Sequence, residues 1–168
     1  MVYRAPCRDV CIKMTSRPCI NAHALVGRVQ YQAKPDTAIK GEEFVMKVIS
    51  TENAPKAIGP YSQAIEANGL VFASGQIPIN PAVGKIEAET IEEQAEQACK
   101  NVKAIMEAAG LGMENVVKTT CLLADINDFK AFNAVYEKYF VSKPARSCFA
   151  VKDIPAGALV EIEAVAAR

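Results

Sequence analysis

The residues best suited to chemistry are one arginine, Arg146, and two glutamates, Glu161 and Glu163, near the carboxyl end of the chain. After residue 43 the chain has ten lysines but only one other arginine, the terminal Arg168. A guanidinium presents a planar fork that binds a carboxylate through two parallel hydrogen bonds, which an ammonium group cannot do. The pattern therefore indicates a site that binds a small carboxylate beside a general base.

Strand alternation predicts which way these side chains point. In a strand over Leu159–Ala166, Glu161 and Glu163 lie on one face, and apolar residues on the other face point to a core. In a strand over Arg146–Lys152, a buried Phe149 places Arg146 and Cys148 on the same face as the glutamates. An ordinary cross-strand ion pair is the alternative, worth about 0–1 kcal/mol when exposed.

The remaining elements follow from local signals. Thr90 with Glu93 is a capping box that opens a helix ending at Gly110, and Asp128 precedes a second helix over Phe129–Phe140. The other expected strands are Met46–Thr51, Ser62–Ala67, Leu70–Ser74 after an Asn68-Gly69 turn, and one within Asn115–Asp125. The order βββαβαββ, with a hairpin at each end, predicts an α+β fold in which a single mixed six-stranded sheet carries two helices on one face.

Composition is ordinary for a soluble globular protein, with 51% hydrophobic and 23% charged residues among 168 and a formal net charge of zero. The length allows one domain and an extension. Residues 44–168 hold twelve Lys/Arg and fifteen Asp/Glu, a balance of −3, which argues against nucleic acid as a partner. No apolar run is long enough to span a membrane, so we expect no membrane association.

The first 43 residues differ from the rest. They hold seven Lys/Arg and four Asp/Glu, a balance of +3, and four of the six arginines lie before residue 29. An arginine-rich, acid-poor start predicts an organellar transit peptide at 1–43, for the chloroplast rather than the mitochondrion, and a globular domain at 44–168. The alternative is an unstructured tail without an address, which would leave the protein in the cytoplasm.

Metal binding is not expected. Cys7 and Cys11, like Cys19 and His23, are four residues apart, but a metal site would need all four on one ordered element, which this composition does not favour. His23 is the only histidine of the chain. If the leader is removed, histidine-based catalysis is excluded.

Several segments together carry a resemblance that covers about residues 48–168. They are Ala57-Ile58-Gly59-Pro60-Tyr61-Ser62-Gln63-Ala64, Ala73-Ser74-Gly75-Gln76-Ile77-Pro78, Val117-Lys118-Thr119-Thr120, Phe132-Asn133-Ala134-Val135-Tyr136, Pro144-Ala145-Arg146-Ser147 and Ile162-Glu163-Ala164. With them the chain resembles the reactive intermediate deaminase (RidA/YjgF) family. The resemblance implies a cofactor-independent enzyme that hydrolyses 2-iminopropanoate and 2-iminobutanoate, released by pyridoxal-phosphate-dependent dehydratases, to 2-oxo acids and ammonia. It also implies a chorismate-mutase-like trimeric barrel, a homotrimer with its clefts between subunits.

The same resemblance assigns roles to individual residues. Arg146 would bind the substrate carboxylate, Glu161 would position and polarise the attacking water, and the Cys148 backbone would orient the imine end. The cleft would be lined by Tyr61, Ser74, Gly75 and Asn133. The residues alone also allow purely structural roles. Tyr61 fits a core aromatic, the Asn133 side chain fits a hydrogen bond to nearby backbone, and Cys148 fits a small buried hydrophobe. The short Val141–Lys143 segment departs from the family pattern and leaves the substrate range open.

Two other functions stay open at this stage. The first is an RNA-directed ribonuclease or translation inhibitor, as some members of the family are described. The second is a small-molecule or chaperone-like binding module that uses the same clefts without turnover.

Overall fold

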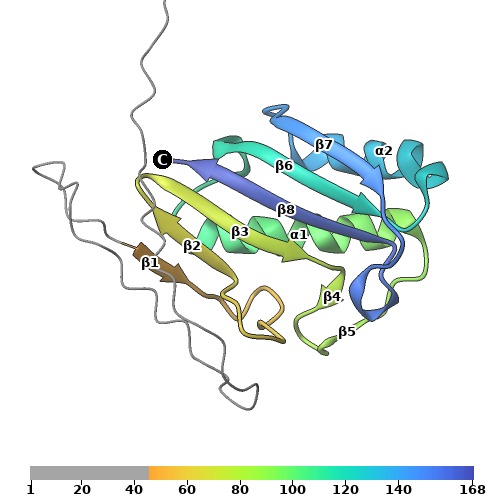
Figure 1. Ribbon diagram of the computed structural model, residues 1–168, viewed down its shortest axis with the longest axis horizontal. Coiled ribbons are helices and arrows are strands. Elements are labelled where there is room, and N and C mark those ends of the chain that lie inside the picture. Colours follow the sequence, from red (N-terminus) through yellow and green to blue (C-terminus); the bar gives the residue numbers. More distant parts are fainter. Residues whose placement is uncertain (1–45) are drawn as a thin grey trace, which may run out of the picture. The chain divides into compact units, whose positions relative to one another are not determined.

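The computed structural model describes residues 46–168, and the leader predictions, with Cys7, Cys11, Cys19 and His23, lie outside them. The described part is a six-stranded mixed sheet with two helices behind one face (Figure 1). The sheet contains β1 (Met46–Ile49), β2 (Ala64–Ala67), β3 (Leu70–Gln76), β6 (Val116–Leu123), β7 (Ala145–Ala150) and β8 (Val160–Ala167). The helices are α1 (Ile91–Ala108) and α2 (Phe129–Tyr139). The α+β fold class and the order βββαβαββ of these elements are confirmed.

The strand order is β1-β2-β3-β8-β6-β7, which corrects the expected carboxyl-terminal hairpin. Strand β7 pairs with β6 in parallel, and β8 runs antiparallel between β3 and β6. Helix α2 connects β6 to β7, and a crossover of this kind makes the second strand parallel to the first. The expected loop around Pro81 contains a small second sheet of β4 (Ile79–Asn80) and β5 (Lys85–Ile86).

Helix α1 is built as its capping box indicates. The Thr90 side chain accepts from the Glu93 backbone N–H, and the Glu93 carboxylate accepts from the Thr90 backbone N–H. Gly110 follows the helix at a φ of 73°, a conformation that glycine adopts at little cost. One apolar stripe of α1 is buried against the sheet: Ile91, Ala95, Ala98, Val102 and Ile105.

Helix α2 begins after Asp128, as expected, but the Asp128 side chain makes no capping bond. Asp125 instead accepts a hydrogen bond from the Asn127 backbone N–H at 2.9 Å and opens a short 3₁₀ turn before the helix. The face of α2 that packs on the core carries aromatic rings, of which Phe132 and Tyr136 are buried. These rings therefore lie beneath the edge of the sheet formed by β6 and β7.

Strand β3 carries the irregularity that matters for the site. It leaves the Asn68-Gly69 turn, where both residues have positive φ, and pairs with β8 up to Ala73. The next pair is Gln76 with Ile162, so Ser74 and Gly75 form a β-bulge opposite Glu163. Bulges bend a strand and re-aim its residues, and they are common beside active sites.

From residue 46 onward, no helix is long and apolar enough to cross a membrane. Over the same residues, no cluster of three or more His, Cys, Asp or Glu side chains is arranged to hold a metal ion.

Candidate active site

The glutamates of β8 lie where alternation puts them, on the face of the sheet away from the helices, which we call the open face. Val160, Ile162 and Ala164 are buried on the helix side, whereas Glu161 is half-buried and Glu163 exposed. Figure 1 is viewed onto the open face, with α1 and α2 behind the sheet.

Arg146 and Cys148 do not share this face with the glutamates, which corrects the prediction. Arg146 is the strand partner of Thr119, and Cys148 that of Cys121; both partners are buried on the helix side. Phe149 was expected in the core but lies on the open face and is 47% exposed. Strand β7 is an edge strand beside the aromatic face of α2, so the core takes the smaller thiol and leaves the ring outside.

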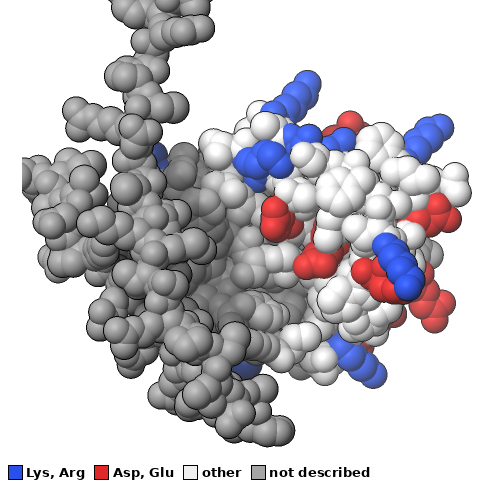
Figure 2. Space-filling model, viewed as in Figure 1, with Lys and Arg blue, Asp and Glu red and all other residues white. Residues whose placement is uncertain are grey.

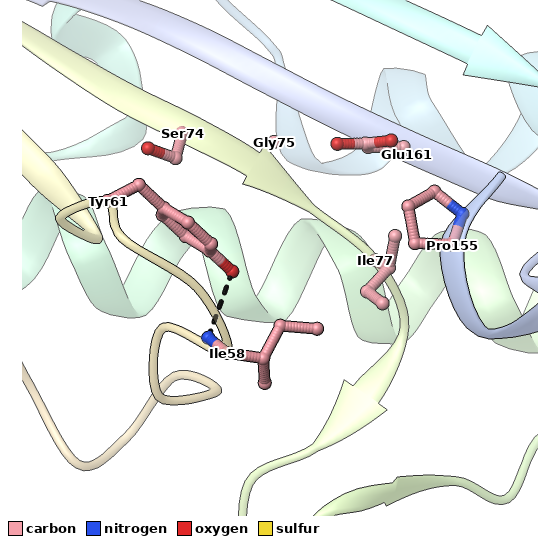
Figure 3. Close-up of a pocket in the computed structure, with 7 residues that line it drawn as sticks. All are labelled: Ile58, Tyr61, Ser74, Gly75, Ile77, Pro155 and Glu161. Carbon is pink, nitrogen blue, oxygen red and sulfur yellow. Dashed lines mark hydrogen bonds between the residues drawn. The ribbon is translucent and has the colours of Figure 1, made fainter. Parts of the chain in front are cut away.

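A cavity of about 290 Å³ forms around Glu161. It brings together four of the predicted site residues, Tyr61, Ser74, Gly75 and Glu161, and adds three apolar ones, Ile58, Ile77 and Pro155 (Figure 3). We call this set the glutamate cavity. Its walls come from the bulge of β3, from β8 and from the two flanking loops. Sequence reasoning missed the three apolar residues, although Ile58 and Ile77 lie inside the motifs that carry the family resemblance.

Gly75 makes room for the Glu161 carboxylate, which points towards it in Figure 3. A Cβ at Gly75 would overlap the carboxylate, with the Glu161 Cδ only 2.7 Å away. Burial raises the pKa of Glu161, and the negative charge of Glu163 raises it further. A carboxylate whose pKa is raised towards neutrality is a better general base than an exposed one.

Tyr61 and Ser74 already have polar partners inside the chain. The Ser74 hydroxyl donates to the Ser62 carbonyl at 2.7 Å, and the Tyr61 hydroxyl accepts from the Ile58 backbone N–H at 3.3 Å. Tyr61 is 47% exposed at the rim of the cavity. It is therefore not the core aromatic that the sequence alone also allowed.

Arg146, Asn133 and Cys148 gather on the helix side; we call them the arginine cluster. The Arg146 guanidinium carbon lies 4.7 Å from the centre of the Tyr136 ring, and the rings of Phe129 and Phe132 are within 6 Å. One Arg146 N–H donates to the Asn133 side-chain oxygen at 2.8 Å. Asn133 therefore bonds to the arginine side chain and not to nearby backbone.

Arg146 makes no ion pair with any residue from 46 to 168. The cross-strand pair with Glu161 or Glu163, which the sequence left open, is therefore wrong. Aromatic faces and one amide hold the guanidinium in place and leave several of its donors unused by the described residues. Such a group is suited to bind an external carboxylate.

Cys148 is half-buried behind Arg146. Burial raises the pKa of its thiol, and the nearby Arg146 charge only partly opposes this effect. A thiol with a raised pKa is mostly protonated at neutral pH and is a poor nucleophile. The predicted role of the Cys148 backbone, which does not need a reactive thiol, stays a prediction.

The described residues form a small α+β protein with a ligand cleft. It has a mixed sheet with two helices on one face, a carboxylate over a glycine bulge, and an arginine that has no ion-pair partner within residues 46–168. The family model described as Endoribonuclease L-PSP matches residues 51–168. The chain belongs to this family, which includes the reactive intermediate deaminases.

Relatives with known names are similar over most of the domain. Reactive Intermediate Deaminase A, chloroplastic, of Arabidopsis thaliana is 50% identical over 130 residues, 77% of this chain and 70% of that protein. The 2-iminobutanoate/2-iminopropanoate deaminase of Escherichia coli K12 is 48% identical over 126 residues, 73% of this chain and 98% of that protein. The crystal structure of E. coli TdcF with bound serine matches at a TM-score of 0.70 and 44% identity, covering 73% of this chain and 98% of that one.

Proposed function

We propose that the protein hydrolyses small 2-imino acids, such as 2-iminobutanoate and 2-iminopropanoate, to 2-oxo acids and ammonia without a cofactor. The observation that carries the proposal is the Glu161 carboxylate, whose pKa burial raises, held over Gly75 in a cavity of about 290 Å³. The names of the Arabidopsis and E. coli relatives support it. The substrates would come from pyridoxal-phosphate-dependent dehydratases, which are the functional partners that we expect.

The chemistry needs one water and one base. Glu161 accepts a proton from water as the oxygen adds to the carbon of the protonated imine, so that the nitrogen becomes the amine of a carbinolamine. Glu161 then gives this proton to the nitrogen. The carbon–nitrogen bond breaks to release ammonia, and Glu161 takes the hydroxyl proton as the carbonyl forms, later passing it to ammonia or solvent. Arg146 holds the substrate carboxylate, and the Cys148 backbone orients the imine end. Because the imine carbon is already electrophilic, orientation supplies much of the acceleration.

We propose that the complete site forms between subunits of a homotrimer, the chorismate-mutase-like barrel. The support is that Arg146 and Glu161 lie on opposite faces of one sheet, so one chain does not bring them together. The open face also exposes large apolar side chains, as an interface between subunits would require: Met46, Val48, Leu70 and Phe72. In Figure 2, uncharged side chains cover much of the described part of this face, with a few acidic ones in its middle.

A coupled assay tests the activity. A threonine dehydratase generates 2-iminobutanoate, semicarbazide traps it, and the protein is titrated against the trap. We expect the parent protein to outcompete semicarbazide and Arg146→Ala to fail. An unchanged trapping rate with the parent protein would refute the deaminase proposal and leave a binding module.

Arg146→Lys separates geometry from charge. It keeps the positive charge but loses the two-pronged carboxylate contact, so we expect most of the activity to be lost, with a raised KM. Steady-state kinetics over a range of imine concentrations measure this. Wild-type turnover in Arg146→Lys would contradict the assignment of a carboxylate clamp.

The family description favours ribonuclease activity as a second candidate. The balance of −3 over residues 44–168 opposes it, because RNA binding normally relies on a basic surface. An RNase assay with Glu161→Gln as the control distinguishes the two functions. Activity that persists in this variant and disappears on further purification belongs to a contaminant.

We further propose that residues 1–43 address the protein to an organelle, with the chloroplast preferred. The chloroplastic relative from Arabidopsis supports this assignment. A fusion of residues 1–43 to a fluorescent protein, imaged in plant cells, tests it. A diffuse cytoplasmic signal would contradict it.

A further inference from the structure

The buried polar side chain nearest to the Ser74–Gly75 bulge is Gln76. It lies on the helix side of β3 opposite Ile162, and it is only 5% exposed. Its amide nitrogen donates to two backbone carbonyls, that of Ser74 at 3.0 Å and that of Gly75 at 3.3 Å. Both carbonyls belong to the bulge, whose two residues have no register partner of their own in β8.

Such an arrangement has a clear energetic role. A carbonyl shielded from water costs free energy unless a donor reaches it. One amide here serves both carbonyls of the bulge, so the orientation of both peptide planes depends on Gln76. The bulge in turn determines where Gly75 lies, and the Glu161 carboxylate rests on Gly75 with no room to spare.

We propose that Gln76 is a positioning residue, which fixes the bulge under Gly75 and thereby holds the Glu161 carboxylate in the glutamate cavity. The proposal rests on the proposed function only in taking Glu161 as the catalytic base. Its structural content, a link from the Gln76 amide through Gly75 to Glu161, is independent of the substrate.

The state of the Glu161 carboxylate reports on this link directly. Among residues 46–168, the only other titratable group that lines the glutamate cavity is Tyr61, and the only charged residue raising the pKa of Glu161 is Glu163 on the same strand. Across β6, Leu122 is the strand partner of Glu161 and carries no charge. If the bulge relaxes, the carboxylate gains water, and its pKa falls towards the ordinary carboxyl value.

The test is an NMR titration of protein labelled with ¹³C at the glutamate carboxyl groups, with the Glu161 signal assigned by its loss in Glu161→Gln. Gln76→Met keeps the side-chain length but removes the amide. We expect a lower pKa for Glu161 in this variant, and a fall in kcat for imine hydrolysis on the order of 10–100-fold with a smaller change in KM. Gln76→Asn, a milder change, should shift both quantities less and in the same direction.

Gln63→Met is the matched control. Gln63 is also a buried glutamine, 4% exposed, whose amide nitrogen donates to three backbone carbonyls, those of Thr51, Ala54 and Pro55, outside the bulge. It should lose stability without moving the Glu161 titration. An unchanged Glu161 pKa in both Gln76 variants, or an equal shift in Gln63→Met, would overturn the proposal. Because the titration needs no substrate, its outcome is independent of whether the deaminase assay succeeds.

Discussion

At the scale of single residues, the Glu161 carboxylate occupies the space that a side chain at position 75 would need. A Cβ at Gly75 would overlap the flexible end of the Glu161 side chain, and Gly75 does not have a positive φ. We therefore expect Gly75→Ala to fold normally but to displace the carboxylate. The expected loss in kcat is on the order of 10–100-fold, because small misplacements of a catalytic group are costly. Circular dichroism and imine kinetics measure the two effects.

Gly112→Ala is the control for this change. A Cβ at Gly112 would also overlap a glutamate carboxylate, that of Glu114, which is exposed and outside the glutamate cavity. If Gly112→Ala loses as much activity as Gly75→Ala, displacement at the cavity is not the cause.

Glu161 should also cost the protein stability at neutral pH. Its pKa is raised in the folded state, so the folded protein holds the proton more strongly than the unfolded chain. Stability contributed by this group is therefore complete below the unfolded pKa and falls as pH rises through the folded pKa. We expect Glu161→Gln to melt at a higher temperature than the parent at pH 7, with the difference closing in acid. A lower melting temperature at pH 7 would mean that favourable contacts hold the ionised carboxylate.

The sequence indicated which residue types matter, but it predicted only in part which face of the sheet each side chain points to. The scarcity of arginine singled out Arg146 as a carboxylate-binding residue, which stays a prediction, and among residues 46–168 this side chain has no ion-pair partner. Its face was wrong because the prediction buried Phe149, the larger apolar residue of the strand. Whether an edge strand buries its ring or its thiol depends on α2, which packs against it from elsewhere in the chain, and no local pattern contains that information.

At the scale of elements, the start of α1 is stabilised by two reciprocal hydrogen bonds between Thr90 and Glu93. Thr90→Ala removes the hydroxyl that accepts from the Glu93 backbone, and losing an N-cap of this kind costs about 1 kcal/mol. We expect a lower melting temperature with unchanged kcat, because Thr90 lies outside the glutamate cavity. Thr90→Ser, which keeps the cap, should behave like the parent. Equal melting temperatures for the Ala and Ser variants would contradict this role of the cap.

Elements whose signals are local were therefore predictable: the capped helix, the Asn68-Gly69 hairpin and the alternating strand β8. The insertion of β8 between β3 and β6 was not, because pairing between distant strands depends on which faces remain to be buried. The bulge was also missed. In the sequence, Gly75 and Gln76 look like the start of an ordinary loop. Only the β3–β8 register shows that two residues, Ser74 and Gly75, lie opposite the single residue Glu163.

At the scale of the whole molecule, the two halves of the proposed site lie on opposite faces of one sheet. The arginine cluster is on the helix side at the β7 edge, and the glutamate cavity is on the open face. A single chain would therefore bind the carboxylate and activate the water in two separate places. The two functions meet only if a second copy brings its arginine cluster to the cavity of the first.

Mixing two inactive variants tests this arrangement. We expect Arg146→Ala and Glu161→Gln each to disable every site of the proposed homotrimer. In trimers reassembled from an equal mixture, a site is intact when its arginine comes from the Glu161→Gln chain and its glutamate from the Arg146→Ala chain. Random assembly around a closed ring makes about one quarter of the sites intact, so about one quarter of the parent activity should return.

A mixture of parent protein with the double variant, which carries both Arg146→Ala and Glu161→Gln, controls for reassembly. If each site lay within one chain, no intact site could form from the two single variants, and the mixture would stay inactive however well it reassembled.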